Sequence, residues 1–366
     1  MSIKSYRKKS GSGMIGENTF QDYKYITSKE VFLKWINYLK DTFSIIGPVK
    51  GEKDTSFRQI DSLHELSLEY SSTMLPPGKI FIYEPYREIC SFIFSEDIII
   101  KEPVEVEKKQ ILLGVHPCDT CAILYLDKTF LGLYKDKYYE ERRKNTLIIS
   151  LNCSTVLPEC FCSSVGTGPF LKDGSLCDIL LTEIDGSYLI EIESAKGKEI
   201  FNLRSEKATK KELKKKLEKE ADVKSSIKKF VDLKNLDEVF SKSMSHKVWK
   251  EVADERCLSC CNCVMVCPTC FCYEIFDMTS MDLKSVKRFR RLDACQDVKF
   301  AEVHGGNFRQ KRSARLRQFV THKMNQTWQY GMYGTVGCGR CIRWCPTHID
   351  LTEITKEIQR GLKVGK

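Results

Sequence analysis

The sequence lacks long apolar runs, a secretory signal and the common hydrolytic or nucleotide-binding motifs. A membrane-spanning helix needs about 18 consecutive apolar residues, and every apolar stretch of this sequence is much shorter. We therefore expect no membrane association. The first twenty residues are basic and lack the apolar segment of a signal peptide. The patterns G-x-S-x-G, H-E-x-x-H and the P-loop are also missing, which leaves no sign of hydrolytic or nucleotide-dependent chemistry.

Gly11, Gly13 and Gly16 match G-x-G-x-x-G, but the context of a dinucleotide site is missing. The motif needs a hydrophobic strand before it and a helix after it, because the helix N-terminus binds the pyrophosphate. Here the basic stretch 7–10 precedes it, and no strand or helix pattern surrounds it. We therefore predict a flexible tail over residues 1–27.

Histidine is scarce, whereas cysteine is abundant. Three of the six histidines, His304, His322 and His348, have no partner at the spacing of a metal site. His116 stands before a proline, where a histidine more often shapes a turn than binds metal. The 18 cysteines, in a chain without a secretory signal, indicate metal ligands rather than disulfides. We expect the protein to work in a reducing, anaerobic cytoplasm.

Five cysteines stand close together in the run Cys257-Leu-Ser-Cys260-Cys261-Asn-Cys263-Val-Met-Val-Cys267-Pro268. The spacing C-x₂-C-x₂-C-x₃-C-P is that of [4Fe–4S] ligands in bacterial two-cluster ferredoxins. Three of these thiolates bind three corners of one cube, and the fourth, ahead of the proline, binds a second cube. Zinc is the alternative, but structural zinc sites typically use two separated pairs, so the run favours iron–sulfur.

A second run begins with threonine where the first begins with cysteine: Thr335-Val-Gly-Cys338-Gly-Arg-Cys341-Ile-Arg-Trp-Cys345-Pro346. In the two-cluster pattern, each run gives three ligands to one cube and its last cysteine to the other. One cube would then be complete, with the ligands Cys257, Cys260, Cys263 and Cys345. The other would have only Cys267, Cys338 and Cys341.

The missing ligand of this second cube leaves three outcomes open. A more distant cysteine supplies it, with Cys295, Cys270 and Cys272 as candidates. Alternatively, the cube keeps an open iron or is a three-iron form, or the second cube is absent. Cys270 and Cys272 can equally be small buried residues of their loop. Cys261, between two ligands, is expected to point away from the cube.

The net charge of +10 has a use near these motifs. Much of the excess lies in residues 207–229, which we interpret as a solvated helix face, and in residues 284–317, between the two cysteine runs. A cube held by thiolates is anionic, so neighbouring cations offset its charge and help to set its potential. No nucleic-acid recognition module is apparent, and we expect no nucleic-acid partner.

The remaining patterns predict an α+β protein with two domains. Residues 28–240 are expected to form a mixed α/β domain, because a helical pattern over 28–43 is followed by short β-branched runs separated by turn residues. A Lys/Glu-rich surface helix over 205–222 marks the boundary. Residues 241–366 have few strand signals and are expected to form a mainly helical, ferredoxin-type [4Fe–4S] dicluster domain.

The first domain carries its own group of cysteines near the ends of predicted strands. Cys118 and Cys121 follow one strand, Cys153 ends another, and Cys160 and Cys162 come a few residues later. Strand ends meet at one edge of a sheet, where a site can form. Buried structural thiols would explain the same pattern, so the residues alone leave both interpretations open.

Several short segments carry a family resemblance. They are Gly114-Val-His-Pro-Cys-Asp119, Cys160-Phe-Cys-Ser-Ser-Val-Gly166, Cys267-Pro-Thr-Cys-Phe-Cys272, Gly305-Gly-Asn-Phe-Arg309 and Gly337-Cys-Gly-Arg-Cys341. Together they resemble the sulfhydrogenase beta subunit family, whose wider group includes the iron–sulfur electron-transfer subunit of anaerobic sulfite reductase. The resemblance runs from about residue 79 to residue 350, and Asp127-Lys-Thr-Phe130 leans towards the hydrogenase-type branch.

The resemblance implies an iron–sulfur electron carrier in a soluble complex. Such proteins pass electrons between a flavin subunit that uses NAD(P)H and a catalytic partner, either a [NiFe] hydrogenase or a sirohaem sulfite reductase. The resemblance also implies a third cluster in the N-terminal domain, held by Cys118, Cys153, Cys160 and Cys162, and it leaves Cys121 a structural role. The family usually has cysteine at the position of Thr335, so the ligation of the second cube stays open.

Three functions compete on this basis. The chain is an electron relay, a stand-alone reductase with a substrate site at the open iron near Thr335, or a zinc-binding interaction module. We favour the relay, because the chain has no flavin or nicotinamide fingerprint of its own. The arginines within 288–291 and 309–317 would then either dock an acidic flavoprotein or balance cluster charge.

Overall fold

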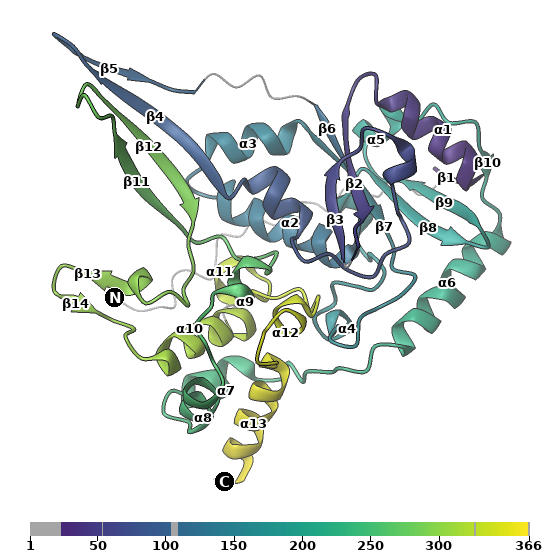
Figure 1. Cartoon of the computed structure of the whole chain (residues 1–366). Helices are drawn as coiled ribbons and strands as arrows, with labels where there is room; N and C mark the ends of the chain where they lie inside the picture. The colour runs from purple at the N-terminus through teal and green to yellow at the C-terminus, as the bar shows by residue number, and fades with distance from the viewer. Residues whose placement is uncertain (1–22, 53, 104–108, 326, 365–366) are drawn as a thin grey trace.

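The computed structural model describes residues 23–52, 54–103, 109–325 and 327–364 (Figure 1). Of the tail predicted over 1–27, residues 1–22 lie outside this part. The end of the predicted tail instead forms a strand of the main sheet, β1 (Lys24–Ser28). Within the described ranges, no helix combines the length and the apolar character that crossing a bilayer requires.

The N-terminal part is built on a sheet of eight strands in the order β10-β1-β9-β8-β7-β6-β2-β3. Besides β1, the strands are β2 (Ser44–Lys50), β3 (Thr55–Gln59), β6 (Gln110–Val115), β7 (Thr146–Leu151), β8 (Ile179–Ile184), β9 (Ser187–Ile192) and β10 (Glu206–Lys207). The central strands β2, β6, β7 and β8 run parallel, and the outer pairs are antiparallel. Strands β6 and β7 consist mainly of Ile, Leu and Val and are buried almost throughout, as expected for a sheet covered on both faces.

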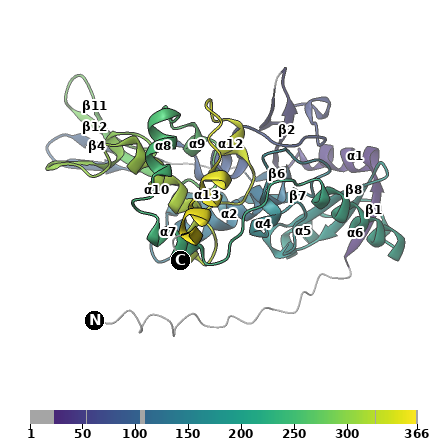
Figure 2. The same cartoon turned by 90° about the horizontal axis from the view of Figure 1, so that it is seen from below.

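Helices cover both faces of this sheet, which gives three layers (Figure 2). The helices are α1 (Lys29–Leu39), α2 (Pro117–Phe130), α3 (Lys137–Lys144), α5 (Ala195–Ile200) and α6 (Lys210–Ser225), the last being the predicted Lys/Glu-rich surface helix. Successive side chains of a strand point to opposite faces. Accordingly, Ile111 packs with Phe32 and Trp35 of α1, whereas Leu112 packs with Leu126 of α2.

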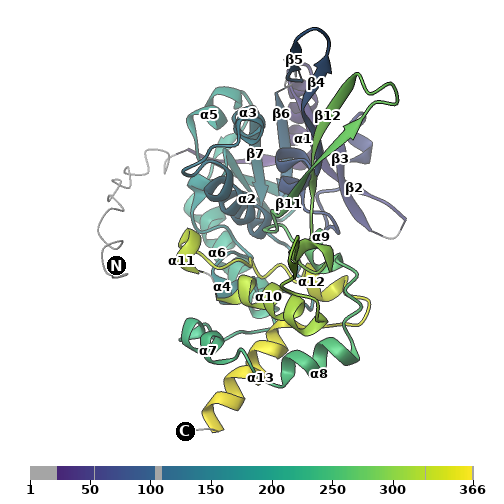
Figure 3. The same ribbon diagram turned by 90° about the vertical axis from the view of Figure 1, so that its left-hand side faces the viewer.

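A second sheet joins the two parts of the chain. Its order is β11-β12-β4-β5, with β4 (Tyr86–Phe94), β5 (Ile98–Lys101), β11 (Tyr273–Thr279) and β12 (Ser285–Leu292). Strand β12 pairs antiparallel with β4, and the sheet projects from the body as an arm (Figures 1 and 3). The prediction of a mainly helical C-terminal domain is therefore not confirmed, and strand pairing crosses the boundary predicted between residues 240 and 241.

The cysteine runs lie among short helices that pack beside the main sheet (Figure 1). These helices are α4 (Cys162–Val165), α7 (Leu236–Lys242), α8 (Val248–Glu255), α9 (Asn262–Met265), α10 (Arg312–Met324), α11 (Thr327–Tyr330), α12 (Arg340–Arg343) and α13 (Leu351–Val364). Leu316 and Phe319 of α10 are buried in one core with Trp249 and Ile354. Val336 is buried in a different core, the one that α2 forms with the main sheet. The two parts of the chain therefore share apolar packing.

Candidate iron–sulfur sites

The four predicted ligands of the first cube line one cavity, which we call the first-cluster site. They are Cys257, Cys260, Cys263 and Cys345. Cys261, which we expected to point away, and Cys341, which we assigned to the second cube, line the cavity as well. The empty volume of about 520 Å³ includes open solvent, and apolar side chains such as Leu316 and Phe319 belong to the wall. Ser259 (φ 53°) and Cys261 (φ 66°) adopt left-handed backbone, which turns the loop tightly between the cysteines. Four thiols in an apolar wall are the donor set that a [4Fe–4S] cube requires.

Arginines from the basic stretch surround this first-cluster site. Arg312 donates to the carbonyl of Cys257 (2.9 Å) and to that of Asp254 (3.1 Å). Buried Arg315 donates to the Ser259 hydroxyl (3.1 Å). By contrast, the arginines of the arm are already ion-paired, Arg288 with Asp277 at 2.7 Å. These contacts favour charge balance at the cluster over docking of a flavoprotein.

The three cysteines assigned to the second cube also face one another, in what we call the second-cluster site. The thiol of Cys341 interacts with those of Cys267 and Cys338, and burial raises its pKa well above the ordinary value. Thr335 is buried, and its hydroxyl accepts a hydrogen bond from the Gly337 amide (3.2 Å). That bond holds Thr335 within its own loop.

Of the three candidates for the fourth ligand, Cys270 lies beside Cys267. Its amide donates to the carbonyl of Cys267 (3.4 Å), and the Cys267 thiol together with burial raises the pKa of Cys270 well above its ordinary value. Cys295 interacts with Cys272 and Cys261 and also with Cys263 of the first-cluster site, and burial raises its pKa to about 12. Cys270 is thus the candidate beside Cys267, and the identity of the fourth ligand stays a prediction.

The N-terminal cysteines meet at the carboxyl edge of the parallel strands, in what we call the N-terminal thiol site. It consists of Cys118, Cys153, Cys160 and Cys162. Cys118 lies in the first turn of α2 after β6, and Cys153 follows β7. The thiol of Cys153 interacts with those of Cys162 and Cys160, and Cys118 interacts with Cys153. Burial raises the pKa of all four thiols, to about 11 for Cys160.

This thiol site also has four sulfurs at the edge where α/β sheets hold their ligands. Cys121 stays outside the group, with its thiol 3.9 Å from the carbonyl of Thr167. Among the described residues, no three His, Cys, Asp or Glu side chains lie as close as a single metal ion demands. A cube spreads its four thiolates over four irons, so it does not require that closeness.

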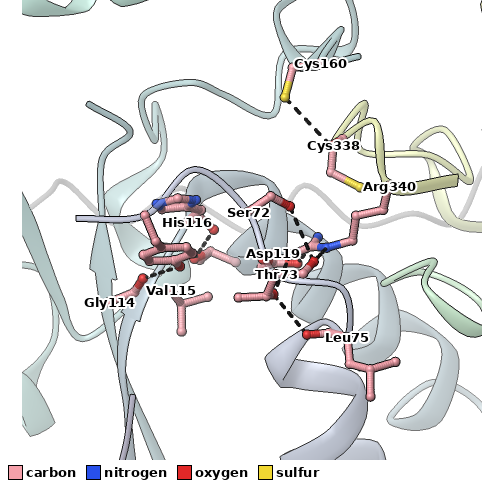
Figure 4. A network of polar contacts seen from close by, with 12 residues as sticks. Ser72, Thr73, Leu75, Gly114, Val115, His116, Asp119, Cys160, Cys338 and Arg340 are labelled. Carbon is pink, nitrogen blue, oxygen red and sulfur yellow. Dashed lines mark hydrogen bonds and ion pairs between the residues drawn. The ribbon is translucent and has the colours of Figure 1, made fainter. Parts of the chain in front are cut away.

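A buried ion pair connects the N-terminal thiol site with the second-cluster site (Figure 4). Arg340, between Cys338 and Cys341, donates two hydrogen bonds of 2.7 Å to the Asp119 carboxylate and one of 2.6 Å to the carbonyl of Thr73. Arg340 and Asp119 are each 1% exposed. We did not predict this pair, although a charged residue inside each cysteine motif was its signal.

Two glycines allow the second cysteine run to touch the N-terminal part. A Cβ atom on Gly337 would lie 2.6 Å from the backbone of Cys162, and one on Gly339 would lie 2.7 Å from that of Glu159. Both glycines have positive φ. The Cys160 thiol then lies 3.7 Å from the carbonyl of Cys338 (Figure 4), so the two sites adjoin each other.

A cavity opens at the same sheet edge, with an empty volume of about 1330 Å³ that includes open solvent. Its wall includes His116, Tyr70 and Asn152. His116 is the N-cap residue of α2 and has extended backbone. It stacks on Tyr70 with 4.0 Å between the ring centroids, and burial lowers its pKa to about 3, so the ring is neutral near pH 7.

Comparisons with known proteins agree with iron–sulfur clusters in the C-terminal region. Residues 256–349 match the family model described as a 4Fe-4S dicluster domain, so the C-terminal region is of iron–sulfur type. The whole chain is similar to "Sulfhydrogenase 2 subunit beta" of Pyrococcus furiosus, with 36% identity over 339 residues, which cover 91% of this chain and 97% of the relative. No solved structure matches the chain. The chain belongs to the sulfhydrogenase beta subunit family, and it is an iron–sulfur protein of hydrogenase-related electron transfer.

Proposed function

We propose that this chain is the iron–sulfur relay subunit of a multi-subunit oxidoreductase of the sulfhydrogenase type. It would pass electrons between a flavoprotein subunit that uses NAD(P)H and a catalytic subunit such as a [NiFe] hydrogenase. The name of the similar protein, a sulfhydrogenase subunit, supports a hydrogenase-type partner over a sulfite reductase.

The observation that carries the proposal is that the three thiol sites adjoin one another. The Cys160 thiol of the N-terminal thiol site lies 3.7 Å from the carbonyl of Cys338. Cys341 of the second-cluster site lines the cavity of the first-cluster site. Clusters at adjoining sites would exchange electrons directly, and no substrate would need to bind to the chain.

Each site has a proposed set of ligands. Cys257, Cys260, Cys263 and Cys345 hold the first cube; Cys267, Cys338, Cys341 and Cys270 hold the second; Cys118, Cys153, Cys160 and Cys162 hold the third. When bound, a cube supplies one-electron redox chemistry at a potential set by local charge, hydrogen bonds and solvent exposure. The chain's own residues bind the cubes, keep water out by burial and balance their charge, as Arg312 and Arg315 do at the first site.

The test is the iron and acid-labile sulfide content of anaerobically purified protein. We expect about 12 irons per chain, the content of three cubes. In Cys160→Ser, about a third of the iron should disappear, while the EPR signals of the two C-terminal cubes remain. Cys121→Ser is the matched control and should keep all the iron. Zinc without labile sulfide would overturn the relay, and about 8 irons in the wild type would remove the third cube.

A further inference from the structure

Two lysines are completely buried beside the second-cluster site. Lys79 lies in the short π-helix η3 (Lys79–Tyr83) and Lys323 lies in α10, and each is 1% exposed. Lysine is almost never fully buried unless an opposite charge accompanies it. The iron–sulfur motifs do not include either residue, so their burial needs its own explanation.

The hydrogen bonds of these ammonium groups are made, but their charges are not balanced. Lys79 Nζ donates to the carbonyls of Val264 (2.7 Å), Met265 (3.1 Å) and Cys267 (3.2 Å). Lys323 Nζ donates to the Thr269 hydroxyl (3.0 Å). Within the part of the chain that the structure describes, no carboxylate lies within 4.0 Å of either Nζ. An uncompensated buried charge is strongly destabilising.

Cysteine sulfurs are the groups that face both lysines. Cys270 and Cys267 interact with Lys79 and also with Lys323. Thr269 connects them further, because its hydroxyl lies 3.2 Å from the Cys267 sulfur and also bonds Lys323. For Lys79, burial and the neighbouring charge of Lys323 outweigh these sulfurs and lower the pKa below its ordinary value. For Lys323 the sulfurs outweigh burial and raise the pKa well above its ordinary value.

We infer that Lys79 and Lys323 are the fixed counter-charges of the second cluster and hold its reduction potential above that of the first. This inference rests on the proposed function and adds residues that no cysteine motif contains. The reduced cube carries one more negative charge than the oxidised cube, so a nearby buried cation stabilises the reduced form. Of the two arginines at the first-cluster site, only Arg315 is buried. Arg312 is exposed, and water screens its charge more strongly.

The experiment is an EPR-monitored redox titration of the holoprotein and of Lys79→Met and Lys323→Met. At a fixed potential, the ratio of reduced to oxidised second cluster should fall at least about tenfold in each variant, as expected for a charge removed at close range in a medium of low polarity. The signal of the first cluster should keep its potential. Lys34→Met, at an exposed position of α1, is the control for the loss of one positive charge and should leave both potentials unchanged.

Iron and sulfide analysis separates the possible outcomes. If Lys79→Met loses the second cluster while Lys79→Arg retains it, the positive charge itself is required, and the inference holds. Unchanged potentials with full iron content would overturn it, and so would loss of the cluster in both the Met and the Arg variants. If the wild-type protein contains no cubes, the proposed function fails first, which is a distinct result.

Discussion

The two cysteine-bearing regions bring their thiols together in different ways. In the C-terminal region, Cys257, Cys260 and Cys263 stand on one tight loop, and the sequence spacing alone places them around a cavity. In the N-terminal region, Cys118 and Cys153 come from different strand ends. These two residues meet because β6 and β7 are parallel neighbours in the sheet.

This difference predicts different dependence on the rest of the fold. A loop that carries three ligands needs only its neighbouring helices to hold these ligands in place. The cysteines of the N-terminal thiol site come together only if the whole parallel sheet is formed in register. The Arg340–Asp119 pair adds a further requirement, because it fixes the second cysteine run against the strand edge that carries Cys118. Removing that pair should therefore affect the N-terminal site most strongly.

The largest expected effect is that of Asp119→Ala. The substitution leaves the Arg340 guanidinium buried without its carboxylate, which should lower the free energy of unfolding by about 3–5 kcal/mol. Denaturant titration under anaerobic conditions measures this loss. The control is Asp277→Ala, which breaks the exposed pair with Arg288 and should cost less than about 1 kcal/mol. Equal losses in the two variants would mean that the buried pair does not hold the regions together.

The contrast between local and distant partners also explains what could be predicted. The spacing of the ferredoxin runs predicted four of the cysteines that line the first-cluster site, but not Cys261 and Cys341. Arg340 and Asp119 are 221 residues apart in the sequence, and Lys79 is 185 residues from Val264. No spacing rule connects residues so far apart, so these buried charges became visible only in the folded chain.

The arm was missed for a related reason. Its strand β12, Ser285–Leu292, is rich in Lys and Arg, and we interpreted this stretch as a basic surface near the clusters. In the structure Arg288 pairs with Asp277 on β11, and Lys287 pairs with Glu88 on β4. Cross-strand ion pairs of this kind stabilise a sheet, but the partners on another strand are not apparent from one segment. Of the central parallel strands, β6, β7 and β8 coincide with predicted β-branched runs, whereas β2 was not predicted.

An intermediate effect, on the iron content of the second cube, should come from replacing the proposed ligand Cys270 by a cysteine at position 335. Cys270→Ser should convert the second cube to a form with an open or missing iron, with a loss of about one iron per chain. Adding Thr335→Cys in the same chain should restore the cube, because it supplies the cysteine with which such a run usually begins. EPR and iron analysis measure both steps.

Cys272→Ser is the matched control for that exchange, since Cys272 stands in the same loop. It should retain all the iron. If Cys272→Ser or Cys295→Ser loses the cluster while Cys270→Ser retains it, Cys270 is not the fourth ligand, although it lies beside Cys267. The fourth thiolate of the second cube would then come from Cys272 or Cys295.

The smallest expected effect concerns an ion pair that should stabilise the C-terminal region independently of the thiol sites. Asp350 caps α13 through the Thr352 amide (2.8 Å) and bonds Lys229 (2.5 Å). Burial alone would raise the pKa of Asp350, but Lys229 and Thr352 outweigh it and lower the pKa below the ordinary value. A carboxyl with a lowered pKa contributes stability above its unfolded pKa of about 3.9, and this contribution is lost as the pH falls through the folded pKa.

Asp350→Asn keeps a residue that can cap a helix but removes the charge. It should cost about 1 kcal/mol of unfolding free energy at pH 7 and less at pH 2, because the wild-type carboxyl loses its charge as the pH falls through its folded pKa. Denaturant titration at the two pH values measures the difference. Lys229→Met should lose the same increment at pH 7, and the double variant should lose little more than either single one, because both remove one interaction. A cost for Asp350→Asn that is as large at pH 2 as at pH 7 would show that the residue acts through helix capping alone.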